Sequence, residues 1–230
     1  MPLLASGDQD KLRESFEEMT APVRLLFFTQ TFDCETCLQA RQILDELPPL
    51  SDRITIEEAN VLIDKDRAAA YGIDRAPAVV VLGVDENGVP RDSRIRFLGA
   101  PSGYEFVSLV QAILLVGGHG SNLTDANRER VSAVGTPVTM RVFSTPTCPH
   151  CPRAVSLANE MAFANPNITA FAVEATSFPD LARGYRVTGV PKTVVSSAEA
   201  SEDIEILGGL PQDEFIQYAL ADFLEKDQPS

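Results

Sequence analysis

The residues best suited to chemistry in this sequence are its four cysteines, because every one of them belongs to a C-x-x-C pair. The pairs read CETC from Cys34 to Cys37 and CPHC from Cys148 to Cys151. Structural disulfides of secreted domains usually close longer loops and occur in larger numbers in short chains. The chain has 230 residues and no other cysteine. Metal binding or thiol redox chemistry is therefore favoured over stapling.

The chain contains two copies of one unit. A shift of 114 residues, the difference between positions 148 and 34, places the first cysteine pair on the second and Pro77 on Pro191. This register holds without a gap from Thr31 to Val81. We predict one domain at residues 1–117 and a second at 118–230, with the glycine-rich segment 117–122 at the boundary. Each unit is long enough to bury a core of its own.

Each unit reads as the same order of elements, α-β-α-β-α-β-β-α. The expected strands are 23–28, 54–59, 78–84 and 95–98 in the first unit, and 138–143, 168–173, 193–195 and 204–207 in the second. Each cysteine pair opens a helix, and each of these helices should bury one apolar stripe. The two stripes are Leu38, Ile43, Leu44 and Leu47, and Val155, Leu157, Ala158 and Met161.

This order resembles the thioredoxin fold, with a C-x-x-C after the first strand and a proline before the third. Two copies in one chain resemble the protein disulfide oxidoreductases of thermophilic bacteria and archaea, also called glutaredoxin-like. The resemblance implies an α/β protein with two tandem thioredoxin-like folds, each a mixed β-sheet flanked by helices. It implies that Pro77 and Pro191 are cis and lie beside the cysteines. It also places Ala76, Pro77, Val190 and Pro191 at the substrate-binding edge.

A cysteine at the start of a helix meets unpaired backbone N–H groups and the positive end of the helix dipole, and both favour the thiolate. The thiolate attacks a disulfide, and a second cysteine one helical turn later can resolve the mixed disulfide. We therefore assign Cys34 and Cys148 as nucleophiles, and Cys37 and Cys151 as resolving residues. The implied reaction is thiol–disulfide exchange with protein thiols and disulfides, without a bound cofactor and without a metal.

The two sites should differ in redox potential. His150 can stabilise the Cys148 thiolate, which makes the second disulfide more oxidising. Cys34 instead lies between Asp33 and Glu35, two carboxylates that oppose a thiolate. We predict that the second site is the more oxidising and reactive one, and that the first acts as a reducing partner or relay. The first strands hold no Asp or Glu, so the proton acceptor of the resolving cysteines is left unassigned.

The formal net charge of −14 disfavours nucleic acid and anionic membranes as partners. The sequence has no apolar run of about 18 residues. Residues 1–6 have neither a basic start nor an apolar stretch, so we expect a cytoplasmic protein. The sequence contains no G-x-G-x-x-G motif. A reductase partner, such as a flavoprotein of the thioredoxin-reductase kind, would then be a separate protein.

Three other functions fit parts of the sequence. Tandem thioredoxin folds also form the N-terminal part of a flavoprotein that reduces peroxiredoxins, which would make this chain an electron-shuttling reductase module. That part keeps only one C-x-x-C, whereas both are intact here. Four thiolates can bind structural zinc, although zinc ribbons place their pairs about 15–20 residues apart. A scaffold that uses the fold without chemistry would commonly have lost a cysteine.

Overall fold

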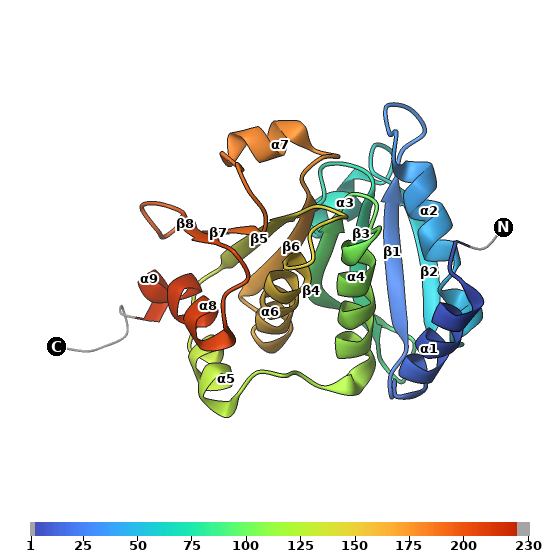
Figure 1. Ribbon diagram of the computed structural model, residues 1–230, viewed down its shortest axis with the longest axis horizontal. Helices are drawn as coiled ribbons and strands as arrows, with labels where there is room; N and C mark the ends of the chain where they lie inside the picture. The colour runs from blue at the N-terminus through green and yellow to red at the C-terminus, as the bar shows by residue number, and fades with distance from the viewer. Residues whose placement is uncertain (1–2, 225–230) are drawn as a thin grey trace.

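The computed structural model describes residues 3–224, and Figure 1 shows their arrangement. The first half of the chain contains α1 (Ser6–Glu17), β1 (Val23–Thr29), α2 (Cys37–Asp45), the 3-10 helix η1 (Pro48–Leu50), β2 (Ile54–Asn60), α3 (Lys65–Ala70), β3 (Ala78–Val84), β4 (Pro90–Leu98), α4 (Tyr104–Leu114) and the π-helical segment η2 (Leu115–His119). The second half contains α5 (Asp125–Ser132), β5 (Val138–Ser144), α6 (Cys151–Ala164), β6 (Ile168–Glu174), α7 (Pro179–Gly184), β7 (Lys192–Ser196), β8 (Ile204–Leu207), α8 (Gln212–Ala219) and α9 (Ala221–Leu224). Within residues 3–224, no helix has the length and apolar character that a membrane crossing requires.

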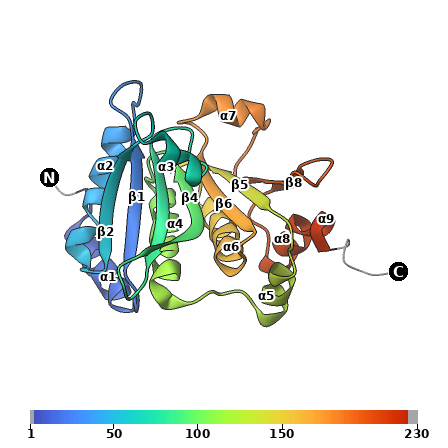
Figure 2. The ribbon, with the colours of Figure 1, turned by 180° about the vertical axis from the view of Figure 1, so that it is seen from behind.

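The two halves share one eight-stranded mixed sheet in the order β2-β1-β3-β4-β6-β5-β7-β8. In each half the first strand pairs in parallel with the second and antiparallel with the third. The halves are joined by parallel pairing of β4 with β6, from Ile95 opposite Ala170 to Leu98 opposite Val173. Figure 2 shows the continuous sheet from behind, with β2 and β8 at its two free edges.

Both faces of the sheet are buried, because alternate residues of the central strands enter two different apolar clusters. Leu25 and Phe27 of β1 enter the larger cluster with residues of α1, α2, α4, α6 and α8. Leu26 and Phe28 enter the second cluster, which includes Ala68 of α3 and Phe178 before α7. The larger cluster contains residues of both halves, so the two repeats share a core as well as a sheet.

The predicted order of elements is confirmed, and seven of the eight strands differ from the predicted ranges by no more than one residue at either end. The exception is β4, which begins at Pro90 and not at Ile95, because residues 90–92 also pair with β3 on the other side of the register shift. The helices begin at Cys37 and Cys151, the second cysteine of each pair. One stripe residue was predicted wrongly: Leu38 is 69% exposed. Leu38 precedes Ile43 by five residues, which turns it away from the buried face. Ala40 occupies that face instead.

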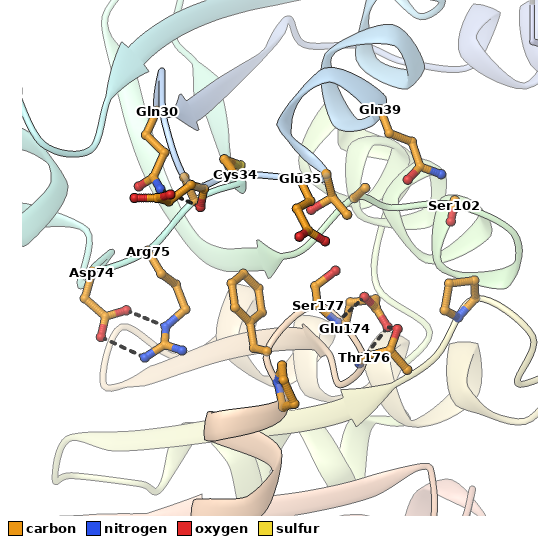
Figure 3. A pocket seen from close by; sticks show the side chains of 17 residues that line it. Gln30, Cys34, Glu35, Gln39, Asp74, Arg75, Ser102, Glu174, Thr176 and Ser177 are labelled. Atoms are coloured by element: carbon orange, nitrogen blue, oxygen red, sulfur yellow. Dashed lines mark hydrogen bonds and ion pairs between the residues drawn. The ribbon is translucent and has the colours of Figure 1, made fainter.

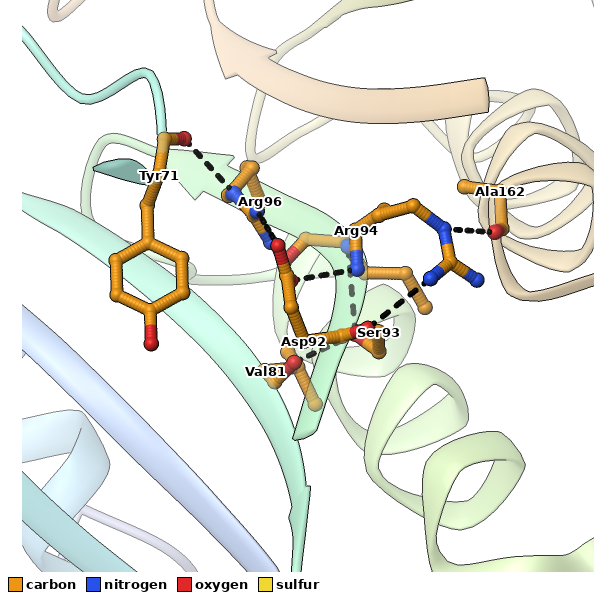
Figure 4. Close-up of polar contacts among 8 residues, drawn as sticks. Tyr71, Val81, Asp92, Ser93, Arg94, Arg96 and Ala162 are labelled. Atoms are coloured by element: carbon orange, nitrogen blue, oxygen red, sulfur yellow. Dashed lines mark hydrogen bonds and ion pairs between the residues drawn. The ribbon is translucent and has the colours of Figure 1, made fainter. Parts of the chain in front are cut away.

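An irregularity in β4 locks the halves together beside the β4–β6 pairing. The register against β3 shifts between Val81 and Leu82, and Arg94 takes a positive φ of 64°. Its guanidinium donates to the carbonyl oxygen of Ala162 near the C-terminus of α6 at 2.9 Å (Figure 4). It also donates to the carbonyl oxygen of Phe163 at 3.1 Å. Cationic donors are favoured at a helix C-terminus, so this arginine fixes α6 against the sheet.

Candidate redox sites

The first cysteine pair lies in the loop between β1 and α2. Cys34 and Cys37 form a disulfide with their Cα atoms 5.4 Å apart. Cys34 is half-buried, whereas Cys37 is buried with 7% exposed. A loop conformation with a positive φ at Asp33 (57°) and hydrogen bonds from the Gln30 amide to two loop carbonyls positions the pair. The less buried sulfur is therefore that of the predicted nucleophile.

The second pair, Cys148 and Cys151, forms a disulfide in the equivalent loop between β5 and α6, with Cα atoms 5.5 Å apart. Cys148 is 8% exposed and Cys151 is 1% exposed. His150 occupies the N-cap position of α6 and is exposed to solvent. The second disulfide is thus more enclosed than the first, while the imidazole beside it remains in contact with solvent.

Both prolines of the repeat follow cis peptide bonds, at Ala76–Pro77 and Val190–Pro191, as the resemblance implied. Ala76 and Cys34 line the same cavity, so the first cis bond lies beside the first disulfide. Each cis proline precedes the third strand of its half, which pairs with the strand that leads into the cysteine loop. The topology therefore brings each proline to the same end of the sheet as its cysteine pair.

An open cavity of about 760 Å³ lies over Cys34, with walls from both halves of the chain. The first half supplies the cysteine loop and the segment before Pro77, and the second half supplies Pro146 and the segment from Glu174 to Pro179 (Figure 3). Its lining does not include Cys148 or Cys151. The structure thus brings each cysteine pair together but places the two pairs in separate surroundings.

Glu105 is a buried acid that the sequence reasoning missed. It lies in the first turn of α4 and is 6% exposed. The Ser144 hydroxyl donates to its Oε1 at 2.5 Å, and its Oε2 has no hydrogen-bond partner. Burial raises the pKa of Glu105 to about 8, the Ser144 hydrogen bond opposes this shift, and the negative charge of Glu174 adds to it. A carboxyl group with such a pKa can exchange a proton near neutral pH.

The position of Glu105 ties it to the second cysteine loop. Ser144 ends β5, directly before that loop. The backbone N–H of Tyr104 donates to the carbonyl of Pro146, two residues before Cys148, at 2.9 Å. A cavity of about 10 Å³, close to the space one water needs, borders both Glu105 and Val155 of α6. Among residues 3–224 no cluster of three or more His, Cys, Asp or Glu side chains could hold a metal ion.

The structure thus consists of two thioredoxin-like halves, each with a C-x-x-C disulfide at the start of a helix and a cis proline before its third strand. A thioredoxin-domain family profile matches residues 138–221. The fold is an α/β fold of two tandem thioredoxin-like domains with a mixed sheet. The structure is similar to the protein disulfide oxidoreductase of Aeropyrum pernix K1, with 26% identity and a TM-score of 0.83, covering 98% of this chain and 96% of that one.

The chain is equally similar to part of a larger protein. The NTD_N/C domain of alkylhydroperoxide reductase AhpF from Enterococcus faecalis matches with 28% identity and a TM-score of 0.82, covering 93% of this chain and 98% of that one. The corresponding alkyl hydroperoxide reductase protein of Escherichia coli K12 is 28% identical over 197 residues, which are 86% of this chain and 34% of that protein. The chain therefore spans about a third of the length of the curated relatives it matches.

Proposed function

We propose that this protein exchanges electrons with the thiols and disulfides of other proteins through both cysteine pairs, with no bound cofactor. The observation that carries the proposal is the arrangement found twice in the fold. In each half, a disulfide lies at the start of a helix, its second cysteine is the more buried one, and a cis proline precedes the adjacent strand. In each half the first cysteine is the more accessible of the two, although in the second half both are buried, with Cys148 8% and Cys151 1% exposed.

The exchange balances without any other reactant. In the reducing direction, the Cys148 thiolate attacks a substrate disulfide, a mixed disulfide forms, and the substrate's other sulfur leaves as a thiolate. Cys151 then loses its proton and attacks Cys148, which releases the second substrate thiol. Two electrons pass from the enzyme dithiol to the substrate, and oxidation of a substrate dithiol is the same sequence reversed. The first pair follows the same steps with Cys34 and Cys37.

We propose that Glu105, a buried acid bonded to Ser144 at the start of the second cysteine loop, handles the proton of the second pair. Its pKa of about 8 lies near that of a thiol, and its Oε2 is free of hydrogen bonds. Proton transfer is most efficient when donor and acceptor have similar pKa values close to the operating pH. We assign to Glu105 the acceptance of the Cys151 proton during resolution, either directly or through a water in the adjoining small cavity.

The second site is proposed to be the more oxidising one. His150 at the N-cap of α6 can stabilise the Cys148 thiolate, whereas Asp33 and Glu35 flank Cys34. Stabilising the reduced form raises the reduction potential of a disulfide. The first pair is then the reducing partner or relay. We propose that the domains span residues 1–117 and 118–230 and that each contains one cysteine pair. We also propose that substrates bind beside Ala76–Pro77 in the first domain and beside Val190–Pro191 in the second.

A second candidate is an electron-shuttling reductase module that feeds a peroxiredoxin. The similarity to the alkyl hydroperoxide reductase AhpF supports it, because the matched part is about a third of that protein. In this role a separate flavoprotein of the thioredoxin-reductase kind would reduce the chain. Two intact cysteine pairs favour general dithiol exchange over this narrower role.

The test is a titration in glutathione redox buffers, with each cysteine pair read separately by differential alkylation and mass spectrometry. We expect both pairs to titrate, with the second clearly more oxidising than the thioredoxin potential of about −270 mV. If the reduction potentials of both cysteine pairs lie near the thioredoxin value, the protein would instead act as a reductase. If neither pair titrates and the thiols are bound to a metal, the proposed thiol–disulfide exchange activity would be excluded.

A further inference from the structure

The cavity over Cys34 carries an excess of negative charge. Its lining includes the carboxylates of Asp33, Glu35, Asp74 and Glu174, and one cationic side chain, that of Arg75. Figure 3 shows Glu35 on the cysteine loop facing Ser177, with Glu174 and Thr176 on the same far wall. The charge therefore comes from both halves of the chain and surrounds the route to the sulfur.

The single cation of this lining is already neutralised. The Arg75 guanidinium donates to both carboxylate oxygens of Asp74, at 3.0 and 3.3 Å, and to Asp180 at 3.3 Å. Its carbon lies 5.3 Å from the centre of the Phe178 ring. Arg75 thereby ties the segment before Pro77 to α7 of the second half and leaves little positive charge for a ligand. The remaining charge of the cavity is negative.

The second site lacks these acids at equivalent positions. The residues that correspond to Asp33 and Glu35 under the repeat are Thr147 and Pro149, and His150 follows. One sequence duplicated within one chain therefore presents different charges next to its two nucleophilic cysteines. The second site provides an internal standard for the electrostatics of the first.

On the basis of the proposed function, we propose that the Cys34 site selects disulfides that carry a positive charge within a few bonds of sulfur and discriminates against anionic ones. Charged clefts raise the local concentration of an oppositely charged ligand by about 10 to 10³-fold. In the reaction, the Cys34 thiolate displaces one cationic thiol from the disulfide, and Cys37 displaces the second. Two electrons pass from the protein dithiol to the small disulfide, and the two released thiolates take up protons from water.

The experiment uses the full chain with Cys148→Ser and Cys151→Ser, so that only the first pair reacts. The probes are three symmetric disulfides of similar length: cystamine with charge +2, bis(2-hydroxyethyl) disulfide with no charge, and 3,3′-dithiodipropionate with charge −2. Second-order rates of oxidation of the reduced protein are followed by alkylation and mass spectrometry. Each rate is divided by the rate of the same probe with free dithiothreitol, which removes differences in intrinsic reactivity.

At about 0.01 M ionic strength, where the Debye length is about 30 Å, we expect the corrected rate with cystamine to exceed that with dithiodipropionate at least tenfold. In about 1 M salt, where the Debye length is about 3 Å, the ratio should fall close to one. The chain with Cys34→Ser and Cys37→Ser, which keeps only the second pair, should show a clearly smaller preference for the cation, set by the net charge of −14 alone.

Two further variants locate the effect. Asp33→Asn combined with Glu35→Gln should reduce the cystamine preference, measured relative to the neutral probe in the same variant. Glu86→Gln, which removes an exposed acid from the β3–β4 turn, should leave the preference unchanged. A ratio near one with a reactive neutral probe would overturn the charge selection while leaving the exchange activity intact. Failure of all three probes to react would overturn the proposed function itself.

Discussion

The Ser144 hydroxyl donates a hydrogen bond of 2.5 Å to Glu105, so the end of β5 in one half is bound to the first turn of α4 in the other. The second oxygen of this carboxyl group has no partner in a region closed to solvent. The bond places a titratable group where two thioredoxin-like halves meet, next to the loop that leads to Cys148. A single thioredoxin-like half would leave α4 without this neighbour.

Replacing Glu105 with glutamine should change how stability depends on pH. The pKa of Glu105 is raised by burial from 4.5 to about 8, so between these values the native state keeps a proton that the unfolded chain has lost. The unfolded state binds fewer protons, and stability therefore falls as pH rises, by about 1.4 kcal/mol per pH unit. Urea midpoints between about pH 5 and pH 8 should lose this slope in Glu105→Gln.

The control for this measurement is Glu214→Gln, which changes an exposed acid in the first turn of α8, the equivalent helix of the second half. It should keep the slope of the wild-type protein. If Glu105→Gln and the wild-type protein have parallel pH profiles, the pKa of the buried carboxyl group is not raised, and the match to a thiol pKa on which its role as proton acceptor rests is lost.

Cys148→Ser should abolish most of the dithiol exchange with a protein disulfide such as insulin, because the site with the more reactive thiolate is lost. Cys34→Ser should leave a larger residual rate. Turbidity of reduced insulin, with dithiothreitol as electron donor, gives both rates in one assay. A greater loss in Cys34→Ser would reverse our ranking of the two sites.

His150→Leu should raise the pKa of the Cys148 thiol, because a hydrogen-bond donor that can stabilise the thiolate is removed from the helix start. Thiolate absorbance near 240 nm, measured in the chain that keeps only the second pair, reports this titration. His119→Leu, a change in the linker far from either pair in sequence, is the matched control. An unchanged curve for His150→Leu would mean that this imidazole is only a surface group.

Gly103→Ala should damage the second site through the first half of the chain. Gly103 has a φ of 55°, and an added Cβ would collide with the carbonyl oxygen of Pro146. Gly88 has a φ of 78° and an open surrounding, so Gly88→Ala carries the conformational cost of about 1–2 kcal/mol without a collision. We expect both variants to have a lower free energy of unfolding. Only Gly103→Ala should lose more than about 2 kcal/mol and shift the redox potential of the second pair.

Arg94→Ala should destabilise the protein by about 2 kcal/mol, because two hydrogen bonds from a charged donor to helix-end carbonyls are lost. Alanine and arginine have the same cost at a positive φ, so the backbone does not contribute. Arg91→Ala, which removes a 76% exposed side chain from the same strand, should stay within about 0.5 kcal/mol. Equal urea midpoints for the two variants would show that the hydrogen bonds from Arg94 to Ala162 and Phe163 do not contribute to the free energy of unfolding.

Much of the fold could be predicted from the sequence, because hydrophobic periodicity and a 114-residue repeat constrain each half independently. The strand 78–84 follows from an unbroken apolar run after Pro77, and β8 follows from Ile204–Leu207 between polar segments. The prediction for Leu38 was wrong because apolar character alone does not fix the direction in which a helical residue points. The cysteine pairs were found because spacing within one turn is a local signal.

The contacts between the halves were not predictable in the same way. Glu105 looks like an ordinary acid in the first turn of a helix, and its counterpart on α8, Glu214, is indeed exposed. Only the packing of the second half against α4 buries it. The acidic cavity over Cys34 likewise depends on Glu174 and its neighbours, which are 140 residues away along the chain. Pairing of β4 with β6 creates both features, and no local pattern encodes it.

The β4–β6 joint is not self-complementary: it sets the last strand of one repeat against the second strand of the next. The two edge strands of the sheet are the repeat counterparts of the joined strands: β8 corresponds to β4, and β2 corresponds to β6. If β8 of one molecule paired with β2 of another in the same way, the pairing would continue indefinitely into a fibre. In the internal joint Arg96 lies opposite Phe171. The repeat counterparts of these two residues are Glu205 of β8 and Glu57 of β2, which would lie opposite each other between molecules. Like charges directly opposite each other destabilise strand pairing. Continued pairing between molecules would therefore bring together two carboxylates that are each ion-paired within their own half, Glu57 with Arg24 and Arg67 and Glu205 with Lys192 and Arg186.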